Sequence, residues 1–215
     1  MYKTKAITTI IFAGLLHLSA TMTVAQEFAG PYAGLGVSYS SGDTDAHWLN
    51  RFSNTGDDSH DLSGVSIGGF VGHNWQNGRS VFGLEAGFDL ADIGGDDNFN
   101  SGIENGTRIS GIGHVSGRVG RASDIGLFYA SLGLAIADVK ATERDIVGGP
   151  LAATNDISHV GARLGLGAEI PFRSGRVRLE VSHVRFDRED SYYPTYSIDS
   201  RPVLNQAGIY YVFGF

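Results

Sequence analysis

Two short stretches place a histidine beside a serine, a pairing that could serve nucleophilic catalysis. His114 and Ser116 are separated by one residue, whereas Ser182 and His183 are adjacent. In an extended strand alternate side chains share a face, so only His114 and Ser116 could meet as a base and a nucleophile. The sequence therefore offers one candidate catalytic pair, and its role depends on which face of its strand it occupies.

A larger set of ionisable residues alternates with apolar residues in strand-like segments. Glu85 and Asp89, for example, alternate with Phe82, Leu84 and Phe88. The set contains four arginines, four carboxylates and two histidines: Glu85, Asp89, Arg108, His114, Arg118, His159, Arg163, Glu169, Arg178 and Glu180. Side chains of this kind form ion pairs when a fold holds them in one confined space.

The segments that carry these residues have the period of two that predicts β-strands. The 31 glycines disfavour a helical protein, because glycine costs on the order of 1 kcal/mol relative to alanine inside a helix. The expected strands are residues 31–40, 63–76, 79–91, 107–120, 125–140, 157–171, 175–187 and 202–215.

Short and long connections alternate between these strands. A tight turn is predicted at Asn77-Gly78, and two more are predicted within 121–126 and 171–176, whereas the other four connections are long and polar. This order is typical of outer-membrane barrels, whose short turns face the periplasm. We therefore predict an all-β fold: an eight-stranded antiparallel transmembrane β-barrel with short periplasmic turns and four long extracellular loops.

The two faces of the predicted strands differ in chemistry. One face carries large apolar side chains and almost no charge, and the other carries the ionisable set and glycine. An eight-stranded barrel is too narrow to enclose so many large apolar side chains, so the apolar face is expected to contact lipid. The ionisable set then faces the lumen, where paired charges can be held. A lumen plugged by Arg/Glu pairs is the favoured interpretation, and a narrow conduit is the alternative.

Residues 1–25 have the order of a secretory signal peptide. Two lysines precede an apolar stretch, and small residues lead to a cleavage site after Ala25. The apolar stretch is shorter than the roughly 20 residues that a membrane-spanning helix needs. We therefore expect residues 26–215 to form the exported outer-membrane β-barrel domain.

Charge and composition limit the classes of partner. The chain carries 16 Lys and Arg against 23 Asp and Glu, so no nucleic-acid partner is expected. There is no cysteine for a disulfide or a thiolate metal site. The acidic loops lack the spacing of a calcium-binding loop, so no metal or cofactor is predicted, although binding of divalent cations by clustered carboxylates stays open. The tyrosine-rich stretch 190–197 fits a binding patch and a membrane-surface aromatic belt equally well.

The chain ends on alternating apolar and aromatic residues, from Ile209 to Phe215. In a closed barrel the last strand pairs with the first, which would satisfy the backbone of this tail. Tyr211, Phe213 and Phe215 resemble the C-terminal signal that the outer-membrane barrel assembly machinery recognises, with Tyr210 where that signal usually has glycine. The expected partners are this machinery, outer-membrane lipid and lipopolysaccharide, and host or surface ligands of the loops.

Three stretches, residues 68–95, 117–139 and 165–187, resemble successive hairpins of the small alphaproteobacterial outer-membrane surface antigens. In this opacity-type, OmpA-like β-barrel family, a Gly-x-Asn-Trp-Gln element precedes a turn and a Gly-x-Glu element follows it. Here Gly72 to Gln76 and Gly83 to Glu85 supply these elements. The resemblance covers nearly all of the chain after residue 25. It implies an eight-stranded barrel in the outer membrane of a Gram-negative bacterium, without catalytic residues.

His114 and Ser116 also resemble the His-x-Ser pair of barrel lipid A deacylases. In those enzymes the pair lies near the C-terminus and faces lipid, whereas here it lies in the fourth predicted strand and faces inward. We therefore do not expect an enzyme. The favoured function is an integral outer-membrane barrel with a structural role in the envelope and a surface-exposed role. A small porin and a surface adhesin or host-interaction protein are the alternatives.

Overall fold

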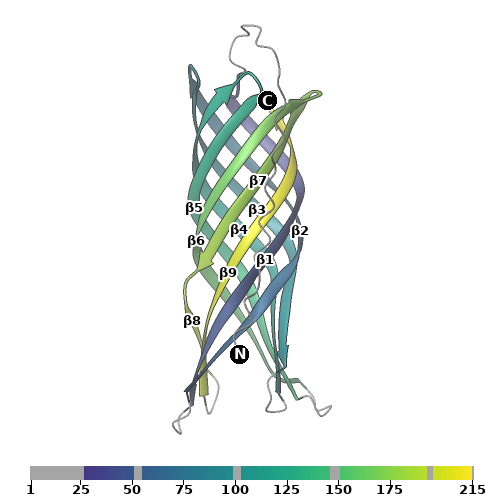
Figure 1. Ribbon diagram of the computed structural model, residues 1–215, viewed down its shortest axis with the longest axis vertical. Helices are drawn as coiled ribbons and strands as arrows, with labels where there is room; N and C mark the ends of the chain where they lie inside the picture. The colour runs from purple at the N-terminus through teal and green to yellow at the C-terminus, as the bar shows by residue number, and fades with distance from the viewer. Residues whose placement is uncertain (1–26, 51–54, 99–102, 146–150, 193–195, 215) are drawn as a thin grey trace, which may run out of the picture.

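The computed structural model describes residues 27–50, 55–98, 103–145, 151–192 and 196–214. They form one antiparallel sheet that closes on itself (Figure 1). Its strands are β1 (Gly30–Asn50), β2 (Thr55–Asn77), β3 (Ser80–Asn98), β4 (Ile103–Ser123), β5 (Gly126–Asp145), β6 (Leu151–Phe172), β7 (Gly175–Phe186), β8 (Glu189–Tyr192) and β9 (Tyr196–Gly214). Within the described residues, no helix is long and apolar enough to cross a membrane.

Strands β1 to β7 are neighbours in chain order, β9 follows β7, and β1 closes the sheet by pairing with β9. β9 pairs first with β8 and then, farther along, with β7. β7 and β8 therefore share one position in the wall, and the wall has eight positions. This arrangement confirms the predicted eight-stranded antiparallel barrel.

The closing pair runs the length of both strands, from Tyr32 opposite Gly214 to Asn50 opposite Tyr196. The backbone of the C-terminal tail is thereby hydrogen-bonded to β1, as predicted. Phe213 points outward and its ring packs against Tyr211, with 4.8 Å between the ring centroids. Phe215 lies outside the described residues.

The turns β2–β3, β4–β5 and β6–β7 are tight and lie together at the upper end of the barrel in Figure 1, which we expect to be its periplasmic end. Gly78 has a φ of 58°, a left-handed conformation that glycine adopts without strain. Arg173 also has a positive φ, of 54°. These turns match the three short connections expected from the sequence.

The extracellular ends of the strands differ from expectation. β1 continues to Asn50 instead of ending near residue 40, and β2 begins at Thr55 instead of residue 63. The strands β1 to β6 contain 19 to 23 residues, whereas about 9–11 tilted residues cross a bilayer. Much of the polar sequence predicted to form long loops therefore extends the barrel wall, because its backbone groups pair across the sheet.

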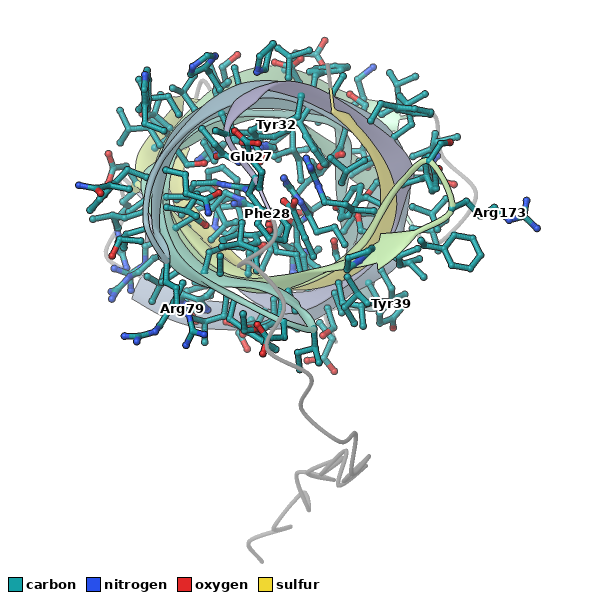
Figure 2. All side chains as sticks on the ribbon, turned by 90° about the horizontal axis from the view of Figure 1, so that it is seen from above. Glu27, Phe28, Tyr32, Tyr39, Arg79 and Arg173 are labelled. Atoms are coloured by element: carbon teal, nitrogen blue, oxygen red, sulfur yellow. The ribbon has the colours of Figure 1, made fainter. Side chains whose placement is uncertain are left out.

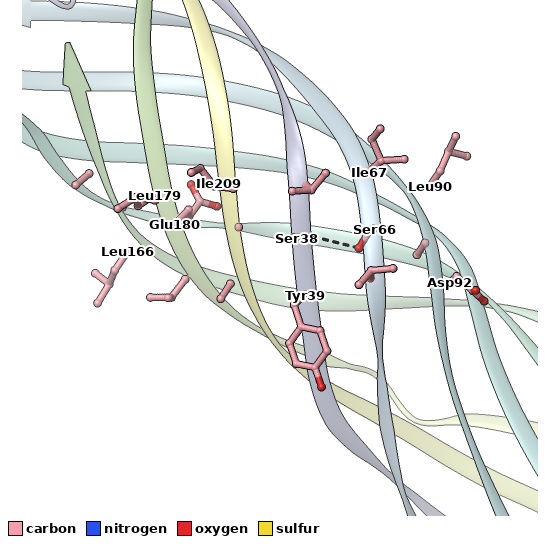
Figure 3. A pocket seen from close by; sticks show the side chains of 18 of the residues that line it. Ser38, Tyr39, Ser66, Ile67, Leu90, Asp92, Leu166, Leu179, Glu180 and Ile209 are labelled. Atoms are coloured by element: carbon pink, nitrogen blue, oxygen red, sulfur yellow. Dashed lines mark hydrogen bonds between the residues drawn. The ribbon is translucent and has the colours of Figure 1, made fainter. Parts of the chain in front are cut away.

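On the periplasmic side of this extension, the outer surface is a lipid-facing band of large apolar side chains. Leu84, Leu132 and Leu164 are between 55% and 67% exposed, and no charged residue interrupts them on that face. Figure 3 shows a hollow in the band whose lining is mainly apolar, with side chains such as Ile67 and Ile209, and which reaches Asp92 at the edge of the band. Its apolar lining and outward position make it part of the surface that contacts lipid.

We call the part of the wall beyond the band the extracellular extension. Here the outer face is charged and the inner face is apolar, which is the reverse of the band. The outer surface carries charged side chains, including the pair Lys140 and Asp156 at 3.6 Å. The interior contains what we call the aliphatic layer, which consists of the aromatic Phe186 and the aliphatic residues Leu62, Ile93, Ile109, Ile112, Ala135, Ala137, Val139, Val184 and Leu204. The barrel thus encloses more large apolar side chains than its width was expected to allow.

Arg108 and Ile109 occupy the faces opposite to those predicted. The pairing of β4 with β5 shifts register between Ile109 and Gly111, which leaves Ser110 as an extra residue. One extra residue reverses the alternation of side chains beyond it. Ile109 is therefore buried inside, and Arg108 points outward, 3.6 Å from Asp92. Arg108 is not part of the lumen.

The lipid-facing band predicts the effect of a charge at its centre. Leu132→Arg should lower the free energy of unfolding in lipid vesicles by about 2–4 kcal/mol, because a cation at the bilayer midplane loses its hydration. Ser63→Arg, which lies outward just beyond the band, should change it by about 1 kcal/mol or less. Urea titrations of both variants measure the difference, and equal losses would contradict this membrane boundary.

Candidate functional site: the polar network of the lumen

The lumen contains a cluster of buried ionisable side chains at the level of the lipid-facing band. Arg178, on β7, is at its centre and is 1% exposed. Its Nη1 lies 2.7 Å from Glu85 Oε2, and its Nη2 and Nε lie 2.8 and 3.1 Å from Glu169 Oε1. Glu180 Oε2 is 3.8 Å from Nη1. One guanidinium therefore interacts with carboxylates from β3, β6 and β7.

Glu169, on β6, is the corresponding anionic centre. In addition to Arg178, it receives Arg118 Nη1 at 2.9 Å on Oε1 and Arg176 Nε at 2.9 Å on Oε2. Arg118 also lies 3.5 Å from Glu85 Oε2. These contacts join four strands through shared charges, so the network is a unit rather than a set of separate pairs.

Aromatic side chains complete the network. The Tyr32 hydroxyl donates a hydrogen bond of 2.9 Å to Glu85 Oε2, and the Tyr129 hydroxyl donates to Glu180, which also pairs with Arg163. The Arg178 guanidinium lies 3.8 Å from the centre of the Phe70 ring. That of Arg118 lies 4.7 and 4.5 Å from the rings of Tyr32 and Tyr129. These rings exclude water from the guanidinium faces and interact with their charge.

Glycines provide the space for these large side chains. Most ionisable residues of the lumen have a glycine as their cross-strand partner, and the pairs are Glu85 with Gly72, Asp89 with Gly68, Arg118 with Gly83, His114 with Gly87, Arg163 with Gly133 and Glu180 with Gly167. A Cβ on Gly167 would lie 2.4 Å from the Tyr129 ring, a separation that real atoms do not tolerate. The glycines inside the strands therefore serve packing.

Six members of the predicted set meet in the network: Glu85, Arg118, Arg163, Glu169, Arg178 and Glu180. His114 lies at its edge, with Nε2 3.7 Å from Glu85 Oε1. Asp89 is buried within electrostatic reach of His114 and Arg163.

His159 is buried but lies apart from the network. Its Nδ1 is 3.2 Å from the backbone oxygen of Asp187, and its ring packs against Phe186 in the aliphatic layer. The period of two correctly predicted that His159 points inward. Because β6 contains 22 residues, however, His159 lies farther along the barrel than the polar network.

A family model described as outer membrane protein beta-barrel domain matches residues 10–200. The chain belongs to this family. The barrel is 34% identical over 155 residues to the 22 kDa outer membrane protein of Rhizobium leguminosarum bv. viciae, a match that covers 68% of this chain and 63% of that relative. The chain thus spans less than two thirds of the length of this relative. These matches place the barrel in the outer membrane of a Gram-negative bacterium, as predicted.

The barrel also has the fold of the outer membrane protein OprG from Pseudomonas aeruginosa. The TM-score is 0.51 at 12% sequence identity, and the match covers 90% of this chain and all of that structure. At such low identity the likeness shows the fold alone.

Sequence reasoning missed Arg176 and the inward aromatic residues of this outer-membrane barrel. Arg176 has the same alternation as Arg178 and could have been found from it. Phe70 lies on the same alternation as Asn74, and Tyr129 on that of Ser131, so the period of two could also have found them.

The polar network links the strands of the wall to one another and contains no evident reaction centre. His114 and Ser116 face the lumen and not the lipid, and Ser116 is buried. In the part of the chain that the structure describes, no group of three or more histidine, aspartate and glutamate side chains could hold a metal ion.

Removal of one charge from this network should destabilise the barrel. Glu169→Ala leaves the positive charges of Arg118, Arg176 and Arg178 undercompensated, and breaking a buried pair in this way costs about 3–5 kcal/mol. Asp92→Ala removes the exposed partner of Arg108 and should cost about 1 kcal/mol or less. Urea unfolding in lipid vesicles, followed by tryptophan fluorescence, compares the variants. Equal midpoints for Glu169→Ala and the unmodified protein would contradict the cohesive role.

Proposed function

We propose that this protein is a closed structural barrel of the outer membrane that presents an extracellular surface. The observation that carries the proposal is the filling of the lumen in three successive layers. The aliphatic layer occupies the extracellular extension, and the polar network lies on its periplasmic side. An apolar cluster of Phe28, Val81, Ala122, Leu127 and Tyr129 lies at the periplasmic end.

The chemistry of these layers supports closure rather than conduction. In the polar network, the carboxylates are already bound to arginines, so a passing cation would have to break ion pairs. The aliphatic layer is lined almost entirely by apolar side chains, with His159 as a polar neighbour of Phe186, and apolar constrictions block ions by excluding water. A permeating solute would therefore meet two barriers of opposite chemistry in series.

The extracellular extension supports the surface-exposed part of the proposal. Its outer wall is charged and its core is aliphatic, which is the distribution of a water-soluble barrel. The wall thus remains folded beyond the lipid-facing band and carries the ends of the strands away from the membrane. Binding of host or surface ligands would occur at this end.

The proposed partners follow from the same surfaces. Outer-membrane lipid and lipopolysaccharide would contact the lipid-facing band and the charged wall of the extracellular extension. The outer-membrane barrel assembly machinery would recognise the C-terminal tail that contains Tyr211 and Phe213.

Planar-bilayer recordings test the closed lumen. The refolded chain from Gln26 to Phe215 should produce no reproducible current steps, and Glu85→Ala and Arg163→Ala should remain silent because the aliphatic layer still closes the lumen. A known porin in the same bilayers provides the positive control. Current steps whose size changes in the two variants would overturn the proposal in favour of the small porin.

Surface labelling tests the extracellular extension. Lys140 points outward there with its side chain 52% exposed, and the other two lysines of the chain, Lys3 and Lys5, lie in the predicted signal peptide. A membrane-impermeant amine reagent should modify Lys140 on intact cells, and Lys140→Arg should abolish this modification. Modification that requires permeabilised cells would contradict the proposed orientation of this wall.

A further inference from the structure

The residues just before β1 enter the periplasmic end of the barrel. Two side chains of β2 hold the backbone of Phe28 there: its N–H donates a hydrogen bond of 2.6 Å to Gln76 Oε1, and its carbonyl oxygen accepts one of 3.0 Å from Asn74 Nδ2. The two carboxamides thus satisfy both backbone groups of one residue, as a neighbouring strand would do.

The Phe28 ring is buried in the same place. It is 1% exposed and packs in the apolar cluster with Val81 and Leu127. The guanidinium of Arg176 lies 5.4 Å from the centre of the ring and also contacts Glu169, so the ring borders the polar network. In the view down the barrel axis in Figure 2, Phe28 lies inside the ring of strands, whereas Arg79 and Arg173 lie outside it.

The motif from Gly72 to Gln76 accounts for the two carboxamides. Alternation along β2 turns Asn74 and Gln76 inward, whereas Trp75 points outward and packs against His73, with 4.7 Å between the ring centroids. Gln76 Nε2 also donates a hydrogen bond of 2.9 Å to the backbone oxygen of Gly78. This bond holds the amide nitrogen toward the turn and leaves the amide oxygen directed at Phe28.

We propose that Asn74, Gln76 and the apolar cluster form a binding site for the N-terminal segment of the chain itself, which acts as a plug of the periplasmic mouth. The site suits an extended peptide with an aromatic side chain, because it forms hydrogen bonds with one backbone N–H and one backbone carbonyl and buries one ring. Residues 27–29 precede the first strand and belong to no strand pair. The plug can therefore leave the mouth without the separation of any two strands.

The plug is the detachable part of the periplasmic layer, because Phe28 belongs to that layer but to no strand. It covers the periplasmic side of the polar network, whereas the aliphatic layer covers the extracellular side. Departure of the segment would expose Val81 and the cluster to the periplasm while the aliphatic layer kept the lumen shut.

Cysteine accessibility tests the plug, because the chain contains no cysteine of its own. Val81→Cys places a thiol under Phe28, Val184→Cys places one in the aliphatic layer, and Ser174→Cys places one on an exposed turn at the periplasmic end. Each is reacted with a water-soluble maleimide in the refolded full barrel. The thiol at position 81 should react at least ten-fold more slowly than the thiol at position 174.

When Phe28→Ala or Asn74→Ala is combined with each cysteine variant, the rate of maleimide reaction at position 81 should rise at least ten-fold. The rate at position 184 should stay unchanged. The unchanged rate at position 184 separates loss of the plug from general loosening of the barrel. The proposal is overturned if position 81 reacts as fast as position 174 with Phe28 in place, if Phe28→Ala leaves it slow, or if positions 81 and 184 accelerate together. An unchanged rate in Asn74→Ala alone would overturn the role of the carboxamide.

Discussion

Closure of the sheet is the constraint on which the rest of this structure depends. In a hydrocarbon environment every backbone N–H and C=O must find a partner within the protein, and a sheet satisfies this condition only when it has no free edge. The pairing of β1 with β9 removes that edge. Closure at eight strands then leaves a narrow interior, so whatever the strands direct inward must pack as densely as a protein core and neutralise its own charge.

The polar network is a solution to that second requirement. Arg178 and Glu169 sit at its centre, and each interacts with several opposite charges from different strands. Glycine opposite most of the charged residues provides the volume that these side chains need. A slip of one residue between two strands would turn these charges toward lipid, so the network and the lipid-facing band together specify the register.

The exchange of chemistry along the strands marks where the membrane ends. In β7, Leu179 and Val181 point outward to lipid, whereas Val184 and Phe186, farther along, point inward to the aliphatic layer. The apolar positions thus move from odd to even numbers at Ser182 and His183. This change is visible in the sequence, but a strand that lies in lipid along its whole length would not have it. The part of the barrel in lipid therefore has an apolar exterior and a polar interior, whereas the part in water has a polar exterior and an apolar interior.

The sequence by itself determined the eight strand positions of the wall, their order, the tight turns and the inward face of most ionisable residues. All of these follow from local period and turn chemistry, and Glu85, Arg163 and Arg178 are examples. Only the tertiary structure decided which charges meet, because contacts such as Arg178 with Glu85 join strands that are distant in the sequence. It also decided the fate of Arg108, since the extra residue at Ser110 exists only relative to β5. The place of Phe28 was decided in the same way, because nothing in its own neighbourhood shows that Asn74 and Gln76 hold it in the closed barrel.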